Sequence, residues 1–363
     1  MNRIFREISE DEFTKFTLSS PTKNYMQSLE MFRRYKKTGR EAYLLGLVEN
    51  KKILVAGLTS VIYKKYGKKF FTMSRGPVMD FKLGTDVLTE FLNETKKFLK
   101  EKNGIILQIS PSLLVPDAPK DFKEKLEKAK FKYLGEYEQV KWIYTINFSE
   151  IENLPKVSLA ESERSYNVLD NTLDAEAEKI LFRTLHKNHR YTVKYATERF
   201  DLRLRELDVD EYNMLYDLVK EAGTVHGFVP RDVNFYKELK ENFKEKATAV
   251  IAELPDGTPI ATGFFLLYGD EVIYLSSGMK REYKKLGGPH LIQWAMIKYT
   301  YKNGFLKYNF WGTHPDPENG VFKFKQGFNG KVEEFIGTFI APLDTLGKIY
   351  IKKLKPAEQR DLQ

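Results

Sequence analysis

The sequence predicts an α/β protein of two tandem domains, each built around a mixed, twisted β-sheet. Three observations predict this class. The chain has 363 residues, which is too long for one ordinary hydrophobic core. Its composition, 42% hydrophobic and 14% aromatic, is sufficient to fill two cores. A pattern of three strands, a helix and a further strand occurs twice, about two hundred residues apart.

Each copy of the pattern carries its own local signals. The first two strands of the second copy are separated by the turn Pro255-Asp256-Gly257, and the helices end at Gly104 and Gly304. The predicted order of strand, strand, strand, helix and strand covers residues 41–50, 51–67, 68–80, 85–104 and 105–111 in the first copy, and 246–259, 260–270, 271–280, 288–304 and 305–313 in the second. We expect residues 1–155 with 338–363 to form the first domain and residues 156–337 to form the second.

This order resembles the central part of the Gcn5-related N-acetyltransferase (GNAT) fold. That fold holds acetyl-CoA at a glycine-rich turn that begins a helix. The first copy has no such turn. In the second copy Arg281 is followed by Gly287-Gly288 at the wrong spacing, and Pro289 lacks an amide donor. The loss of this motif in both copies argues against acyl-CoA as a donor, so no cofactor is predicted.

Charge and missing motifs limit the function classes. Lysine plus arginine number 59 against 50 acidic residues, a net charge of +9, which favours a polyanionic partner. Cysteine is absent, and no zinc-protease, P-loop, dinucleotide or serine-hydrolase motif occurs, so no metal site is expected. With neither a signal peptide nor a membrane span, we expect a cytoplasmic protein, and any membrane contact would be peripheral.

Residues 181–205 are densely basic. Lys187, Arg190 and Lys194 are spaced as one face of a helix. Two interpretations stay open: a solvated cationic face, or a surface for RNA phosphates or anionic lipid headgroups.

A second basic feature follows the loop WGTHPDPENG. Lys323 and Lys325 alternate with phenylalanines in VFKFKQGFNG, which is typical of a strand that ends at a turn. This alternation places both lysines on one sheet face.

Several of these segments resemble the Fem family, aminoacyltransferases that build the interpeptide bridges of peptidoglycan. The resemblance rests on YMQSLEMFRRYKK, SRGPVMD, LHKNHRYTVKYA, HGFVPRDVNFYKEL, FWGTHPDPENG and VFKFKQGFNGKVEEFIGTF. It extends from about Tyr25 to Phe339, and its most specific element is F-K-x-G-F. Fem proteins consist of two acetyltransferase-like domains. Residues 178–205 are too short for the coiled-coil arm of many members, so the chain resembles the arm-less type.

The resemblance implies an aminoacyl-tRNA as donor and co-substrate. It implies as acceptor the side-chain amine of the stem peptide, on lipid II or on UDP-MurNAc-pentapeptide. Both substrates are polyanions, which fits the net charge. Two alternatives from other classes remain: an acetyl-CoA-dependent N-acyltransferase, and a non-catalytic module that binds RNA or membrane.

The resemblance also assigns roles to residues. Lys325 occupies the family position that stabilises the oxyanion, and Lys323 either assists it or is solvated. Arg231 matches the arginine that grips the acceptor pyrophosphate. Lys36 is expected to be a second phosphate ligand, although the alignment could equally select Arg33 or Lys37. The remaining substrate-binding expectations are Phe235, where the family's soluble-precursor enzyme has a tyrosine, and Tyr274, which lines the acceptor groove or belongs to the core. Ser110 stands where the family often has an aspartate, so a carboxylate base is missing there.

Overall fold

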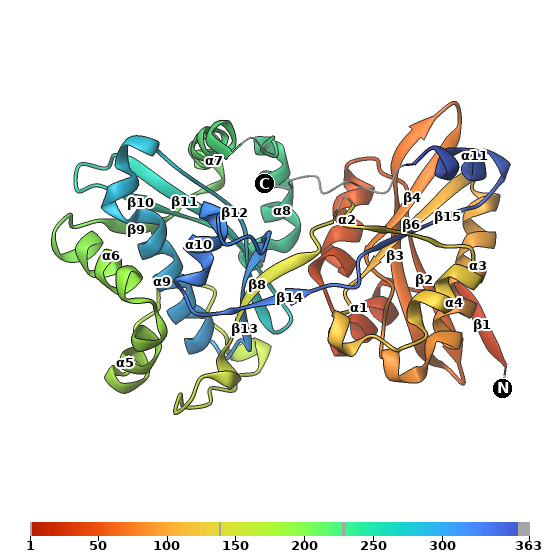
Figure 1. Ribbon diagram of the computed structural model, residues 1–363, viewed down its shortest axis with the longest axis horizontal. Coiled ribbons are helices and arrows are strands. Elements are labelled where there is room, and N and C mark those ends of the chain that lie inside the picture. The colour runs from red at the N-terminus through yellow and green to blue at the C-terminus, as the bar shows by residue number, and fades with distance from the viewer. Residues whose placement is uncertain (1, 138, 227–228, 355–363) are drawn as a thin grey trace. The chain divides into compact units, whose positions relative to one another are not determined.

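The computed structural model describes residues 2–137, 139–226 and 229–354, and divides them into two compact units, each with one sheet (Figure 1). Unit 1 contains the described residues up to Lys141 and from Glu334 to Leu354. Unit 2 contains those of Trp142–Glu333. The predicted α/β class with two mixed sheets is confirmed. In the described residues no helix combines the length and apolarity that a membrane span requires.

The sheet of unit 1 has the order β1-β2-β3-β4-β6-β15-β7, and β5 pairs with β3. Its β4 and β6 run parallel and are joined through α3. The strands are β1 (Arg3–Glu7), β2 (Ala42–Glu49), β3 (Lys52–Lys65), β4 (Lys68–Arg75), β5 (Val78–Met79), β6 (Gly104–Pro111), β7 (Lys132–Gly135) and β15 (Thr338–Pro342). The helices are α1 (Glu10–Ser19), α2 (Leu29–Lys37), α3 (Thr85–Glu101), α4 (Phe122–Lys128) and α11 (Thr345–Lys353).

The sheet of unit 2 has the order β14-β8-β13-β12-β11-β10-β9, and its parallel pair is β12 with β13, joined through α9. The strands are β8 (Trp142–Asn147), β9 (Arg203–Glu206), β10 (Ala247–Glu253), β11 (Pro259–Tyr268), β12 (Glu271–Met279), β13 (Lys307–Gly312) and β14 (Lys331–Glu334). The helices are α5 (Ala175–Thr184), α6 (Lys187–Glu198), α7 (Tyr212–His226), α8 (Val233–Phe243), α9 (Gly288–Lys302) and α10 (Gly320–Gln326). Both sheets therefore contain the repeated order that the sequence predicts.

The chain passes from unit 1 to unit 2 at Lys141/Trp142, earlier than the boundary expected at residue 155. The reason is β8, which pairs antiparallel with β13 and so belongs to the second sheet. The chain returns to unit 1 at residue 334, and β15 pairs antiparallel with β6. The last strand of the repeat is β6 in unit 1 and β13 in unit 2. In each sheet this strand thus pairs with a strand from a distant part of the sequence, β15 or β8.

Layers of helices cover the sheet of unit 2. Adjacent residues of β11 point to opposite faces. Phe264 packs against Tyr212 of α7 and Tyr236 of α8, whereas Phe265 belongs to the core that contains α9. The backbone of α7 approaches β12 closely at Gly278, where an added Cβ would lie 2.2 Å from the carbonyl carbon of Leu218.

This close approach predicts a large effect of one methyl group. We expect Gly278→Ala to lower the free energy of unfolding by roughly 2 kcal/mol or more, because the obstructing atoms are helix backbone. The control is Gly320→Ala, where an added Cβ meets no atom within 4 Å. Urea denaturation measures both; equal midpoints for the two variants would contradict the packing argument.

Candidate functional site

The segment that carries Lys323 and Lys325 is the helix α10, so the predicted strand is wrong. Asn319 caps this helix, and its side-chain oxygen accepts hydrogen bonds from the backbone N–H of Val321 (2.9 Å) and Phe322 (3.1 Å). Residues three apart share a helix face, and Phe322 and Lys325 are both buried. A four-residue alternation was too short to distinguish the strand period from the helix period.

The two lysines consequently face different directions, and the expectation of a shared sheet face is also wrong. Residues two apart on a helix lie about 200° apart around its axis. The side chain of Lys323 is 54% exposed, and its Nζ lies 3.3 Å from a carboxylate oxygen of Glu318. Lys323 therefore has the character of a solvated surface lysine.

Lys325 is only 5% exposed and donates a hydrogen bond from Nζ to the carbonyl oxygen of Gly312. No carboxylate forms an ion pair with it among the described residues. Burial disfavours the charged amine and lowers the pKa of Lys325 to about 7. Strong perturbation of a buried titratable group is typical of functional sites.

Gly312 ends β13, beyond the point where β13 stops pairing with its parallel neighbour β12. The pairing of β12 with β13 covers Glu271–Ile273 and Lys307–Asn309, and β12 continues beyond it to Met279. Trp311 has φ +60°, in the left-handed region, which for a non-glycine residue costs about 1–2 kcal/mol. The end of β13 is therefore held in an unfavourable conformation beside the Lys325 amine.

Two histidines at the start of α6 anchor α10. Nε2 of His189, in α6, lies 2.8 Å from the carbonyl oxygen of Phe324, and the backbone N–H of His186 donates to the carbonyl of Gly327 (2.8 Å). The rings of His189 and His290, the latter in α9, lie 4.5 Å apart. Burial lowers both pKa values, that of His290 to about 3, so both rings are neutral near pH 7. The spacing of these histidines matches no metal motif, and the described residues contain no group of three or more His, Cys, Asp or Glu side chains that could hold a metal ion.

Packing explains the altered glycine turn before α9. An added Cβ at Gly287 would lie 2.7 Å from the Thr192 methyl carbon of α6, and one at Gly288 would lie 3.0 Å from Ala261 and Ile260. These glycines therefore permit close packing at the helix start. In unit 1 a carboxylate lies at the corresponding helix start, because the hydroxyl of Thr85, the first residue of α3, donates a hydrogen bond to Asp121 (2.7 Å).

The predicted acceptor residues of unit 2 lie in and before α8. Asp232 caps this helix by accepting from the N–H of Phe235 (2.9 Å). Arg231 is exposed, and its guanidinium lies 5.5 Å from the centre of the half-buried Phe235 ring. Tyr236 is buried and shares a hydrogen bond with Ser276 of β12 (2.8 Å).

Of the two interpretations of Tyr274, the structure supports the core. Tyr274 is 8% exposed and stacks on Phe265 with ring centres 5.3 Å apart. Burial raises the pKa of its hydroxyl to about 12.

Unit 1 carries the other expected phosphate ligands on α2. Arg33 is paired with Glu10 at 2.6 Å, whereas Lys36 is exposed and has no ion pair among the described residues. Of the two exposed cations, Lys36 is therefore the one without a carboxylate partner among the described residues. Ser110 is buried, and its Oγ accepts from the backbone N–H of Arg75 (3.3 Å), so it is held by the sheet.

The basic segment forms α6, as its spacing predicts. Lys187 and Lys194 are exposed. Arg190 instead donates to the carbonyl oxygens of Arg183 (3.0 Å) and Leu185 (2.6 Å), which belong to α5 and the residue after it. Tyr191, 64% exposed, stacks on Tyr195 at 5.3 Å. The free cationic surface of this helix therefore consists of Lys187 and Lys194 beside an aromatic pair.

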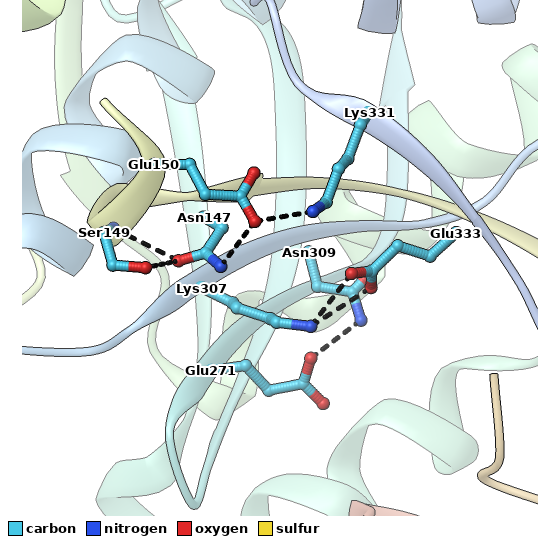
Figure 2. Close-up of polar contacts among 8 residues, drawn as sticks. All are labelled: Asn147, Ser149, Glu150, Glu271, Lys307, Asn309, Lys331 and Glu333. Carbon is cyan, nitrogen blue, oxygen red and sulfur yellow. Dashed lines mark hydrogen bonds and ion pairs between the residues drawn. The ribbon is translucent and has the colours of Figure 1, made fainter. Parts of the chain in front are cut away.

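A cavity of about 540 Å³ lies elsewhere in unit 2, bounded by α5, β8 and the start of β14. Its wall includes Glu150 and Lys331, which are paired at 2.6 Å (Figure 2). None of the predicted site residues lines it.

Known structures share this architecture. The crystal structure of FemX superposes with a TM-score of 0.78 at 17% identity, covering 97% of this chain and 100% of that chain. A tandem GNAT protein from the clavulanic acid biosynthesis pathway has a TM-score of 0.55 at 7% identity, covering 94% and 99%. The fold is therefore that of the tandem GNAT-like proteins.

Sequence comparison gives the family. The FemAB family model matches residues 8–256 and 255–353, and the chain belongs to this family. Aminoacyltransferase FemA from Staphylococcus aureus strains MW2 and MRSA252 is 24% identical over 410 residues, covering 94% of this chain and 95% of the relative. The predicted family and the predicted aminoacyltransferase class are confirmed, and the alternative of a non-catalytic module is set aside.

The burial of Lys325 predicts an unusual stability effect. We expect Lys325→Met to raise the free energy of unfolding at neutral pH by roughly 1 kcal/mol or more, because a buried cation is replaced by an apolar side chain. The folded-state pKa lies below that of an unfolded lysine, so the unfolded chain binds more protons between pH 7 and about 10. Wild-type stability therefore rises with pH across this window.

Urea denaturation at a series of pH values tests this effect. The advantage of Lys325→Met should be largest below pH 7 and should shrink toward pH 10. Lys323→Met is the matched control on the exposed side of α10, and should show no such pH dependence. A destabilised Lys325→Met at pH 6 would contradict the desolvation argument.

Proposed function

We propose that this enzyme transfers an amino acid from aminoacyl-tRNA to the side-chain amine of a peptidoglycan-precursor stem peptide. The observation that carries this proposal is Lys325, a buried amine without a carboxylate partner among the described residues, at the open end of the parallel strand pair. Membership in the FemAB family supports the same reaction class.

The reaction needs little beyond positioning and charge stabilisation. The neutral acceptor amine attacks the ester carbonyl carbon, a C–N bond forms, and the carbonyl oxygen becomes an oxyanion. The C–O bond to the tRNA ribose then breaks, and the ribose oxygen leaves with the proton released by the amine. The protonated Lys325 donates a hydrogen bond to the oxyanion in a site of low dielectric, where such a donor is most effective.

The proton route in this proposal does not involve Ser110, because its hydroxyl is buried in unit 1 and accepts from the backbone. Water, the substrate or the terminal ribose of the tRNA instead relays the amine proton to the leaving ribose oxygen. No cofactor takes part.

The cationic residues supply the substrate contacts. Arg231 is exposed before α8, and its planar guanidinium suits the oxygens of the acceptor pyrophosphate. In unit 1 the expected phosphate ligand is Lys36, which is exposed and has no ion pair among the described residues. For the donor, Lys187 and Lys194 contact tRNA phosphates, and the Tyr191–Tyr195 stack offers an aromatic surface for an unpaired base.

An acyl-CoA donor is less favoured by the geometry of both helix starts. The side chain of Thr192 lies against the start of α9, and Asp121 binds Thr85 at the start of α3. An anionic pyrophosphate at these positions would meet a packed helix in one unit and a carboxylate in the other.

The first test is transfer of radiolabelled amino acids from a mixture of charged tRNAs, with lipid II and UDP-MurNAc-pentapeptide offered in parallel at low salt. Label in either acceptor would support the proposal and identify the donor and the acceptor form. Bound tRNA with no transfer to either acceptor would overturn it. Saturable acetyl-CoA binding and turnover would favour the N-acetyltransferase alternative.

Variants of α10 test the role of Lys325. We expect Lys325→Ala to lower kcat by about 10²–10³-fold, the usual effect of removing one oxyanion donor. Lys323→Ala should retain kcat within about twofold, since Lys323 is solvated. Full activity of Lys325→Ala would contradict the assignment of Lys325 as the oxyanion donor.

A variant of Arg231 tests acceptor binding. Arg231→Ala should raise KM for the acceptor more than it lowers kcat.

The low pKa of Lys325 also predicts a pH profile. The protonated form of Lys325 is the active form, and its fraction falls above a pKa of about 7. The neutral fraction of the acceptor amine, whose normal pKa is about 10.4, rises with pH over the same range. Because these two trends cancel, wild-type kcat/KM should rise up to about pH 7 and then level off, whereas the residual kcat/KM of Lys325→Ala should keep rising to about pH 10. A plateau that begins near pH 7 in this variant as well would belong to another group.

A further inference from the structure

We propose that Asn309, oriented by Glu271, is a positioning residue that fixes the end of β13 and thereby holds the Lys325 amine in place. This inference rests on the function proposed above for Lys325. It concerns residues that no sequence motif singled out.

Asn309 lies at the point where β13 stops following its neighbour. It pairs with Thr145 of β8, whereas Gly312 pairs with Ile143, so β13 contains one more residue than β8 in this interval. This is the geometry of a β-bulge, which bends a strand and redirects its groups. Bulges are frequent next to active sites.

The Asn309 side chain bridges the bulge. Its oxygen accepts a hydrogen bond from the backbone N–H of Trp311 (2.8 Å), two residues further on. Trp311 is the residue with positive φ, so this hydrogen bond stabilises a conformation that its bulky side chain disfavours. The next residue is Gly312, whose carbonyl accepts from Lys325.

Glu271 determines which way the amide of Asn309 faces. The Asn309 amide nitrogen donates to a carboxylate oxygen of Glu271 (2.9 Å), as Figure 2 shows. A carboxylate accepts only, so the NH₂ group must face Glu271 and the carbonyl must face Trp311. Asn309 itself is 1% exposed, and it cannot exchange these partners for water.

Neighbouring charges keep this arrangement together. Lys307, two residues before Asn309, binds both carboxylate oxygens of Glu333 (3.0 and 3.2 Å; Figure 2). Lys307 attracts the Glu271 carboxylate, whereas Glu333 and Asp270 repel it, and burial raises the pKa of Glu271. The hydrogen bond from Asn309 opposes that rise, so each partner supports the other.

The test compares two buried asparagines of unit 2. Asn303 is 3% exposed and also bonds on both sides, accepting from Ser165 (2.8 Å) and donating to Tyr299 (3.0 Å), but it lies outside the β13 bulge. We expect Asn309→Ala to lower kcat at least tenfold with little change in acceptor KM, and Asn303→Ala to change kcat less than twofold. Asn309→Ser, whose hydroxyl can accept from Trp311, should recover part of the loss and remains measurable if Asn309→Ala does not fold.

A substrate-free measurement separates this inference from the proposed function. Acetic anhydride labelling of the full chain at a series of pH values, read for each lysine by mass spectrometry, reports the apparent pKa of Lys325 directly. Its pKa should be near 7 in the wild type and in Asn303→Ala. It should be lower in Asn309→Ala and Asn309→Ser, because displacing the Gly312 carbonyl removes the hydrogen bond that favours the protonated amine. A wild type without transferase activity that still shows these shifts would overturn the function but not the positioning.

Two outcomes would overturn the positioning role. One is an unchanged labelling profile and kcat in Asn309→Ala and Asn309→Ser. The other is an equal loss of kcat in Asn303→Ala, which would show that the loss in Asn309→Ala comes from general destabilisation of the unit. For Glu271, the variant Glu271→Gln keeps an accepting oxygen and should retain more activity than Glu271→Leu; equal losses would remove Glu271 from the network.

Discussion

The candidate site depends on one hydrogen bond, from the buried amine of Lys325 to the carbonyl of Gly312. An ammonium group in an apolar interior is unfavourable, and a single carbonyl offsets only part of its lost hydration. The surrounding structure must therefore supply the remaining constraint. The Asn319 cap fixes the start of α10, His189 and His186 fix its end, and the β13 bulge fixes the acceptor. Each of these contacts holds either α10, which carries Lys325, or the end of β13, which carries Gly312.

In unit 1, two residues of the motifs that carry the family resemblance are buried and hold segments of the unit together. Gln27, part of the N-terminal motif, is buried and bonds to the N–H and C=O of Leu58 and to the carbonyl of Ser74. Arg75, from the motif SRGPVMD, is 1% exposed, lies over the ring of Phe335 at 3.8 Å and donates to the carbonyl of Val140 (2.6 Å). These motif residues join segments of the sheet, so their placement reflects packing and hydrogen bonding within the unit.

The sequence was informative where a period repeated many times or a turn residue stood at a fixed place. Strands of eight or more residues and the helices ending near Gly104 and Gly304 were predictable for this reason. The assignment of Lys325 to the site rests on the family resemblance and stays a prediction. Short segments were not predictable: the Phe-Lys alternation was too brief to reveal the helix that the Asn319 cap starts. Contacts between distant residues, such as Asn309 with Glu271 and His189 with Phe324, depend on tertiary pairing that no local pattern encodes. The domain boundary at 141 depended on the pairing of β8 in the same way.

The return of the chain to unit 1 after residue 333 has a consequence for synthesis on the ribosome. Residues 142–333 form unit 2 from one continuous stretch of chain, whereas unit 1 needs β15, which lies near the C-terminus. Until residues 338–342 emerge, β6 lacks its outer neighbour and presents unpaired backbone groups. The N-terminal half is therefore made first but completed last, and the nascent chain must keep that open edge from pairing with other strands while unit 2 is being synthesised.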